Sequence, residues 1–309
     1  MTGTTHTYSL NATRVAGAAA TNVVAIVDRN HARQVRRQVL NWAKAVILVF
    51  VMLVINLPII LTAINSFRPK NDILSGSTLW PKHVTLDNYQ VVLGKTLFTH
   101  WFINSIWVSL VAMAIALVAS ALAGYSLSRY RTRVNGIFSS MLMAFQLFPL
   151  VLSIIALMVL FQRAHLTKTF FPAIILYIVM SLPFCTWMFK GFFDSIPREL
   201  EESARVDGCT SFQAMVRIVV PLAGPGAAAV AIYAFLLAYN EYMVASAFLK
   251  NPATLNTISI GLRSFFQQNT TEWGQILAAS TIAALPPLVL FLLVQKWMIQ
   301  GMAAGAIKG

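Results

Sequence analysis

The sequence predicts an all-α membrane protein with six transmembrane helices. Of its 309 residues, 58% are hydrophobic and 11% are charged, whereas soluble domains contain about 25% charged residues. Six apolar stretches are long enough to cross a hydrocarbon core of about 30 Å as helices, which takes about 20 residues. The composition therefore argues against a water-soluble enzyme and against a disordered chain.

The expected spans follow in order along the chain: 44–64, 102–127, 137–162, 170–190, 222–249 and 277–298. Each is interpreted as a helix, because a spanning helix satisfies its own backbone hydrogen bonds and lipid cannot do so. Residues 1–40 are expected to form a disordered N-terminal cytoplasmic extension, and residues 41–309 one transmembrane domain. The basic run before the first span comes too late for a signal peptide, which favours an uncleaved first helix.

The distribution of Lys and Arg predicts that both termini lie in the cytoplasm. Fifteen of the 23 basic residues fall in segments that this topology places inside, and eight fall in outer segments. The same bias accounts for the net charge of +13 without nucleic acid as a partner. The outer segments 66–101 and 250–276 are long enough to meet another protein, although both also fit solvated connectors with interfacial aromatic residues.

The segment between the fourth and fifth spans holds half of the ten acidic residues. They are Asp194, Glu199, Glu201, Glu202 and Asp207. A loop that faces anionic lipid does not normally collect carboxylates, but a surface that faces a protein partner can. Pro197 suits the first turn of a helix, and Gly208 suits its C-terminal stop.

A second short helix is expected after Gly208. It begins at Ser211, a good N-cap, and runs to about Val219. Its large apolar side chains recur at helical spacing and are expected to form one face: Phe212, Met215, Val216 and Val219. Pro221 and Pro225 are expected to end it before the fifth span. The segment 194–221 is thus predicted to be helix, glycine turn, helix.

This segment carries a resemblance to a known family. Glu202-Ser203-Ala204, then Gly208 after three residues, then Ile218 after nine and Val220-Pro221 after one more resembles the EAA loop of permease subunits in ATP-binding-cassette importers. Ser203 stands in place of Ala and Val220 in place of Leu. The C-terminal residues from Gln295-Lys296-Trp297 to Gly309, together with Asn240-Glu241, resemble MalG-like carbohydrate permeases. The resemblance covers about residues 40–309.

The resemblance implies a MetI-like type I ABC importer permease fold and a pore subunit in the bacterial cytoplasmic (inner) membrane. Such a subunit moves a sugar or sugar-like solute by alternating access. The implied partners are two ATP-binding-cassette ATPase subunits, a second, MalF-like permease that forms a heterodimer with this chain, and an extracytoplasmic solute-binding protein. No catalytic residue, metal or cofactor is expected on this chain, because ATP and Mg would bind to the ATPase subunits.

The family's roles are carried over by position. The residues implied to couple to the ATPase are Glu199, Glu201, Glu202, Ser203, Ala204, Asp207, Gly208, Phe212, Ile218 and Pro221. The tail at 300–309, with Gly305, Lys308 and Gly309, would contact the ATPase dimer. The segment 250–276 would approach the binding protein.

Polar residues within the spans are the candidates for a solute path. Glu241 is the one acidic residue inside a span, where a charge is costly. It either faces the translocation cavity or a partner, or makes structural hydrogen bonds. Asn240, Tyr239, Asn104 and Gln146 are weaker candidates, and interhelical hydrogen bonds are the alternative for each.

Other functions remain as alternatives. An ion-coupled secondary transporter would show inverted repeats and several buried carboxylates, and a membrane-embedded enzyme would need clustered catalytic side chains. An ABC importer permease for a non-sugar solute also fits. Gly94-Lys95-Thr96 is not a Walker A loop, because Tyr89 occupies the position of its first glycine.

Overall fold

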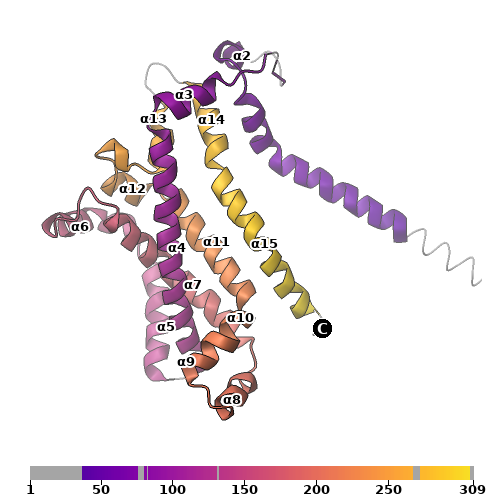
Figure 1. Cartoon of the computed structure of the whole chain (residues 1–309), viewed down its shortest axis with the longest axis vertical. Helices are drawn as coiled ribbons and strands as arrows, with labels where there is room; N and C mark the ends of the chain where they lie inside the picture. The colour runs from indigo at the N-terminus through magenta and orange to yellow at the C-terminus, as the bar shows by residue number, and fades with distance from the viewer. Residues whose placement is uncertain (1–36, 76–79, 82, 131, 267–271, 307–309) are drawn as a thin grey trace, which may run out of the picture. The chain divides into compact units, whose positions relative to one another are not determined.

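A computed structural model describes residues 37–75, 80–81, 83–130, 132–266 and 272–306, and all regular secondary structure among them is helical (Figure 1). The chain divides into two units, Met1–Leu61 and Thr62–Gly309. In the first unit the described residues belong to one helix, Arg37–Asn65, whose last residues continue into the second unit. Most of the expected extension at 1–40 lies outside the described residues.

The second unit is built around four helices. They are α4 (Phe98–Arg129), α7 (Phe171–Asp194), α11 (Gly224–Asn240) and α15 (Leu285–Ala306). Helix α4 packs along α7 and α11, and α11 packs in turn against α7 and α15. The shorter elements are α2 (Lys70–Ser75), α3 (Asp87–Lys95), α5 (Arg133–Gln146), α6 (Leu150–Arg163), α8 (Glu199–Val206), α9 (Ser211–Ala214), η1 (Met215–Val219), α10 (Val220–Leu222), α12 (Met243–Phe248), η2 (Ala253–Leu255), α13 (Ile258–Ser264) and α14 (Trp273–Ala283).

Small side chains allow α4 and α7 to approach closely. Four of them recur every fourth residue on the buried face of α4: Ala112, Ala116, Ser120 and Gly124. At Gly124 an added Cβ would lie 2.7 Å from the Cβ of Phe189 and 3.0 Å from the carbonyl oxygen of Thr186. The backbone of α7 therefore occupies the space that a larger side chain would need. Small residues at helix interfaces serve this purpose in membrane proteins.

Fewer than the six predicted spans are found as single helices long enough to cross a membrane. Among the described residues four helices are long and apolar enough to cross a membrane: Arg37–Asn65, α4, α7 and the α14–α15 pair over Trp273–Trp297. A fifth is formed if Ser211–Leu222 and Gly224–Asn240, which meet at a bend of 79°, count as one span. The fold is therefore all-helical, with four or five spanning helices in the described part of the chain.

Two of the expected spans are interrupted. The region 137–162 forms α5 and α6, of 14 residues each, and a helix of that length spans only about 21 Å. The break at 147–149 ends at Pro149, which disfavours helical backbone in the residue before it. The region 222–249 is broken after Asn240, where Glu241 adopts extended backbone with ψ 126°. The expectation of one continuous helix in each region was wrong.

The two long segments that were expected to lie outside, 66–101 and 250–276, pack against each other through their described residues at one end of the second unit. Lys70 Nζ lies 2.6 Å from Glu272 Oε1. Helix α3 packs against α14, where an added Cβ on Gly274 would overlap the amide of Asn88. Asn88 Nδ2 in turn donates to the carbonyls of Ser66 and Arg68, both at 2.9 Å. The segments thus form one folded cap rather than two separate connectors.

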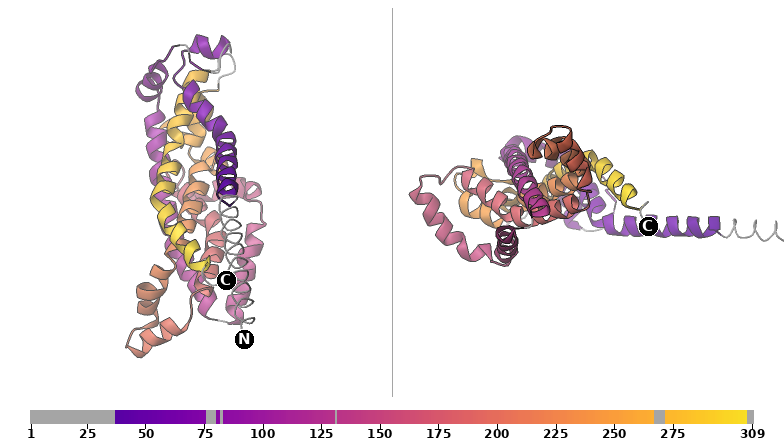
Figure 2. Two further views of the ribbon diagram at one scale, coloured as in Figure 1. Left: turned by 90° about the vertical axis from the view of Figure 1, so that its right-hand side faces the viewer. Right: turned by 90° about the horizontal axis from the view of Figure 1, so that it is seen from below.

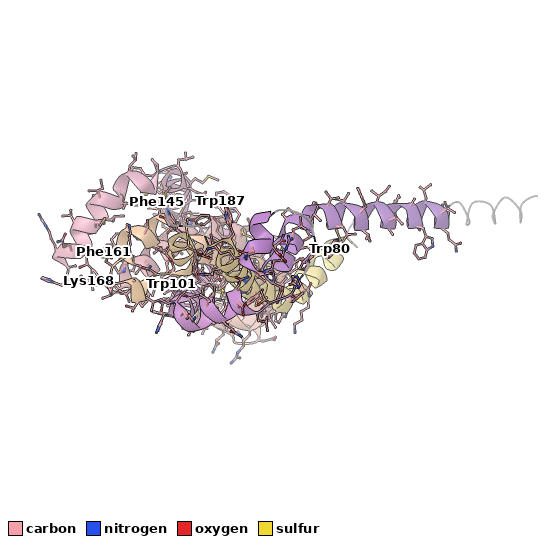
Figure 3. The ribbon with its side chains drawn as sticks, turned by 90° about the horizontal axis from the view of Figure 1, so that it is seen from above. Trp80, Trp101, Phe145, Phe161, Lys168 and Trp187 are labelled. Atoms are coloured by element: carbon pink, nitrogen blue, oxygen red, sulfur yellow. The ribbon has the colours of Figure 1, made fainter. Side chains whose placement is uncertain are left out.

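The beginning of α4 is bonded into this cap. Trp101 Nε1 donates to the carbonyl of Ala253 at 2.9 Å, and its indole covers Gly261 so closely that a Cβ there would overlap the ring. The view from above places Trp101 within the packed body, whereas Lys168 lies at the edge (Figure 3). Asn104 Nδ2 donates to the carbonyls of Thr254 and Asn256, at 2.8 and 3.0 Å.

The close approach at Gly124 can be tested by adding one methyl group. We expect Gly124→Ala to lower the free energy of unfolding by about 1–3 kcal/mol, because the added Cβ overlaps the backbone of α7. Thermal unfolding of the detergent-purified protein measures the change. Gly136→Ala is the matched control, since Gly136 lies inside α5 with open space around it. We expect this control to be neutral or slightly stabilising. Equal losses in both variants would contradict the proposed packing.

Candidate functional site

The segment 194–221, called here the acidic loop, lies at the end of the second unit opposite the cap (Figures 1 and 2). Its first helix, α8, begins at Glu199 after the N-cap residue Arg198. Pro197 therefore precedes the helix instead of lying in its first turn. The three glutamates of the first turn lie at the positive end of the helix dipole, as expected from the sequence.

Helix α8 ends in the predicted glycine turn. Gly208 has φ +91°, a conformation that favours glycine. Its N–H bonds to the carbonyl of Arg205 at 3.1 Å, and the N–H of Cys209 bonds to the carbonyl of Ala204 at 3.0 Å. This pair of bonds is the Schellman motif, which satisfies two of the last carbonyls of α8. The prediction that Gly208 stops the helix is confirmed.

The second helix begins one residue earlier than expected. Thr210, not Ser211, is the N-cap of α9. The Thr210 hydroxyl accepts the N–H of Gln213 at 3.2 Å, and Gln213 Oε1 accepts the N–H of Thr210 at 2.9 Å. Two otherwise unpaired backbone donors are satisfied in this capping box.

The end of the second helix also differs from the expectation. The chain continues from α9 through the π-helical turn η1 into α10, where Pro221 lies within the first turn. Proline is tolerated there, because its missing N–H has no partner to lose. The helix ends at Leu222, and the chain bends by 79° at Ala223 into α11. Pro221 is therefore not the residue that stops the helix.

The predicted apolar face of the second helix is divided between the interior and the surface. Met215 and Val219 are buried against α7 and α11, but Phe212 is 63% exposed and Val216 is also exposed. On α8, Leu200 and Val206 are exposed too, Val206 by 87%. The loop therefore exposes four large apolar side chains, two on α8 and two on the helix that follows it.

The acidic residues of the loop separate in the same way. Glu199, Glu202 and Asp207 are exposed, as are Ser203 and Gly208. Ala204 is buried, and Ile218 is half-buried. Glu201, by contrast, is 7% exposed and forms an ion pair with Arg129. The loop thus presents carboxylates beside apolar side chains on its outside and keeps one carboxylate within.

The residues that hold Glu201 were missed by sequence reasoning. Tyr125 donates its hydroxyl hydrogen to Glu201 Oε2 at 2.6 Å, and Arg129 binds the other oxygen. Arg198 Nη2 donates to the carbonyl of Ser128 at 2.9 Å. Tyr125, Ser128 and Arg129 belong to the end of α4, about seventy positions before their partners, so no local pattern pairs them. The only signal was the basic charge of Arg129.

A groove among α11, α13, α14 and α15 has a volume of about 390 Å³. Two of the candidate solute-path residues, Tyr239 and Asn240, line it together with Ser259 and Ser280. Tyr239 donates its hydroxyl hydrogen to the carbonyl of Ala283 at 2.9 Å, whereas Asn240 is exposed. The groove therefore combines an apolar wall with amide and hydroxyl groups.

The other candidates have structural partners or lie elsewhere. The Glu241 carboxylate accepts the N–H groups of Met243, Val244 and Ala245, at 2.9, 2.8 and 3.2 Å, and so caps α12. These bonds correspond to the structural alternative for Glu241. Asn104 holds η2, as described above, and Gln146 is the exposed last residue of α5.

The tail candidates lie at the limit of the described residues. Gly305 is within α15. Lys308 and Gly309 lie outside the described residues.

Comparisons with known proteins agree on one family. Residues 116–304 match the family described as "Binding-protein-dependent transport system inner membrane component". The chain is 34% identical over 232 residues to the sulfoquinovosyl glycerol transport system permease protein SmoH of Agrobacterium fabrum, covering 75% of this chain and 81% of the relative. It is 33% identical over 266 residues to the maltodextrin transport system permease protein MdxG of Bacillus subtilis, covering 85% and 94%.

A solved structure shares the fold. It is a chain of a bacterial ABC transporter involved in the import of the acidic polysaccharide alginate. The TM-score is 0.69 at 20% identity, over 84% of this chain and 96% of that chain. At this identity the likeness concerns the fold alone.

The cap at Glu241 can be tested by removing its carboxylate. Glu241→Ala leaves three N–H groups at the start of α12 without their acceptor. Two of these donors, Val244 and Ala245, are partly buried. Since a buried donor left unsatisfied costs about 1–3 kcal/mol, we expect the free energy of unfolding to fall by about that amount. Glu241→Gln keeps one oxygen acceptor and should lose less. Unchanged thermal unfolding of Glu241→Ala would show that the cap contributes nothing.

Proposed function

The chain belongs to the family of binding-protein-dependent transport system inner membrane components, and we propose that it is the permease subunit of an ATP-driven importer for a sugar or sugar-like solute. The observation that carries the proposal is the acidic loop. It exposes carboxylates and apolar side chains on a short helix pair, and it continues directly into a helix that lines a groove. ATP hydrolysis belongs to the partner subunits in this scheme.

The acidic loop is the proposed docking surface for an ATP-binding-cassette ATPase. Phe212 and Val216 would supply an apolar anchor, and the exposed acids Glu199, Glu202 and Asp207 add carboxylates to the same loop. Aromatic anchors within a polar rim are typical of protein interfaces. The remaining residues that the resemblance assigned to ATPase coupling are proposed to stabilise the loop instead of contacting the ATPase.

The structural role proposed for each of these residues follows from its position in the loop. Ala204 lies on the buried side of α8, and Ile218 and Pro221 lie on the connection toward α11. Gly208 sets the angle between α8 and α9, and Ser203 bonds its hydroxyl to the carbonyl of Glu199 at 2.8 Å. Glu201 holds the loop to α4 instead of meeting the partner. The tail at 300–309 is a second proposed ATPase contact, on the resemblance alone.

The topology is proposed to include six spans with both termini in the cytoplasm. Helices α5 and α6 together would form the third span, and α11 with α12 the fifth. The basic residues support this orientation, since Arg129, Arg198, Arg205 and Arg217 all lie at the end of the unit that carries the acidic loop. The ATPase surface then faces the cytoplasm, where ATP is available.

The groove is the proposed part of the solute path on this subunit. Sugars present hydroxyl groups beside apolar ring faces, and Asn240, Ser259 and Ser280 offer matching donors and acceptors beside Leu236 and Leu262. The second permease subunit would complete the path. The cap formed by 66–101 and 250–276 would receive the solute-binding protein, because it lies at the end opposite the acidic loop. The relatives named for sulfoquinovosyl glycerol and maltodextrin support a carbohydrate-like solute.

Alternating access supplies the mechanism. ATP binding would close the two ATPase subunits and displace the acidic loops seated on them. Because α10 is joined to α11 through Ala223 alone, that displacement acts on a helix that lines the groove. Each nucleotide state must favour one packing of the helices through its differential contacts.

Reversing one exposed charge tests the docking surface. We expect Glu202→Lys to insert and fold normally but to lose co-purification with the ATPase subunit, because a cation replaces a carboxylate on the docking surface. Affinity purification of the tagged permease followed by quantification of the bound ATPase measures this. Asp87→Lys is the matched control, since Asp87 is an exposed acid in the first turn of α3 at the other end of the unit. Equal ATPase recovery in the two variants would contradict the assignment.

A further inference from the structure

A buried ion pair joins the acidic loop to the end of α4. Arg129 is the last residue of α4 and Glu201 lies in the first turn of α8. Their side chains are 8% and 9% exposed, and Nε of Arg129 binds Oε1 of Glu201. Tyr125 binds the second carboxylate oxygen at 2.6 Å. Both oxygens of this carboxylate are therefore held by α4.

The same guanidinium group binds the end of α7. Arg129 Nη1 donates to the carbonyl of Phe193 at 2.9 Å, and Nη2 donates to the carbonyl of Ile196 at 3.2 Å. The last carbonyls of a helix have no partner within it and carry the negative end of its dipole, which favours a cation there. One side chain thus connects the ends of α4, α7 and α8.

The opposite end of α4 is bonded to a wall of the groove. Ser105 Oγ accepts the N–H of Ile258, the first residue of α13, at 2.6 Å. Asn104 Nδ2 donates to the carbonyls of Thr254, within η2, and of Asn256, which directly follows η2. Helix α13 contributes Ile258, Ser259 and Leu262 to the groove. The 32-residue helix α4, about 48 Å long at 1.5 Å per residue, therefore has a polar joint near each end.

We propose that α4 is a connecting rod between the acidic loop and the groove, with Arg129 and Glu201 as its positioning residues. The inference deepens the proposed function and rests on it. Displacement of α8 by the ATPase would be transferred through the ion pair to α4, and through Ser105 and Asn104 to α13. Helix α8 packs mainly on α9 and η1, so its attachment to α4 depends on these side-chain bonds.

The chemistry of the joint favours transmission over simple stabilisation. A buried ion pair adds little net stability compared with a well-packed apolar replacement. It is directional, however, because a guanidinium group presents its donors in a fixed planar fork. A joint of this kind holds α8 in one orientation on α4 while the loop surface stays free for a partner.

The groove itself can report whether the rod transmits movement. Ser280 lines the groove from α14, outside both joints. Ser280→Cys, in a Cys209→Ser background, provides a thiol whose labelling by a membrane-impermeant maleimide measures access to the groove. Cys185 is fully buried and stays in place. The permease is purified with the ATPase and permease subunits that bind it, reconstituted in nanodiscs, and labelled with and without Mg-ATP plus vanadate.

The expected result is a loss of response in the joint variants. In the parent Ser280→Cys complex, Mg-ATP and vanadate should change the labelling rate. In Glu201→Gln the ATPase should still bind and hydrolyse ATP, but the change in labelling should disappear. Tyr125→Phe keeps the ion pair and removes one bond to Glu201, so part of the change should disappear even if Glu201→Gln fails to assemble. Asp87→Asn, which removes a carboxylate from the cap, should respond like the parent.

The outcomes separate the two proposals. A full response in Glu201→Gln, or in Tyr125→Phe where Glu201→Gln does not assemble, overturns the connecting rod and leaves the permease assignment intact. A parent complex that binds no ATPase, or whose groove does not respond to nucleotide, overturns the proposed function and the rod with it. If the ion pair only stabilises the fold, the joint variants should lose purified complex to the same extent as they lose the change in labelling. That result also counts against transmission.

Discussion

The structure depends on one constraint: a helix that breaks within an apolar chain must find partners for the backbone groups it frees. Lipid offers none. Glu241 supplies three acceptor contacts where α11 ends and α12 begins. Ser105 accepts the first N–H of α13, and Arg129 binds carbonyls at the end of α7. Polar side chains thus satisfy backbone groups at three of the helix ends, and these ends border the groove and the acidic loop.

The fold class could be predicted from composition, but the interruptions could not. Low charge and long apolar stretches predicted an all-helical membrane protein, and this is confirmed for the described residues. Hydropathy is insensitive to a break of two or three residues, so α5 and α6 were merged, as were α11 and α12. Pro149 marked the first break. The second break has no proline or glycine, and its cause is the capping carboxylate of Glu241, which only the three-dimensional structure reveals.

The acidic loop was predictable where its signals are local. Gly208 was predicted to end the first helix of the loop, because glycine readily adopts the left-handed conformation that such a turn requires. This prediction is confirmed. Glu201 and Glu202 are adjacent in sequence, but successive helical residues point about 100° apart, so one is buried and the other exposed. What decides between them is Arg129, which lies 72 positions earlier in the sequence and binds Glu201 from the end of α4. Long-range partners of this kind leave no periodic pattern.

The bend between α10 and α11 has a consequence for the direction in which force is delivered. At 79° the helical segment Ser211–Leu222, which ends in α10, is almost perpendicular to α11. A displacement along the axis of this segment therefore moves the start of α11 sideways, and very little of the movement is directed along the axis of α11. A short stroke at one extremity of the molecule would then tilt α11 across the plane of the bilayer, where sliding it lengthwise would drag apolar side chains into water.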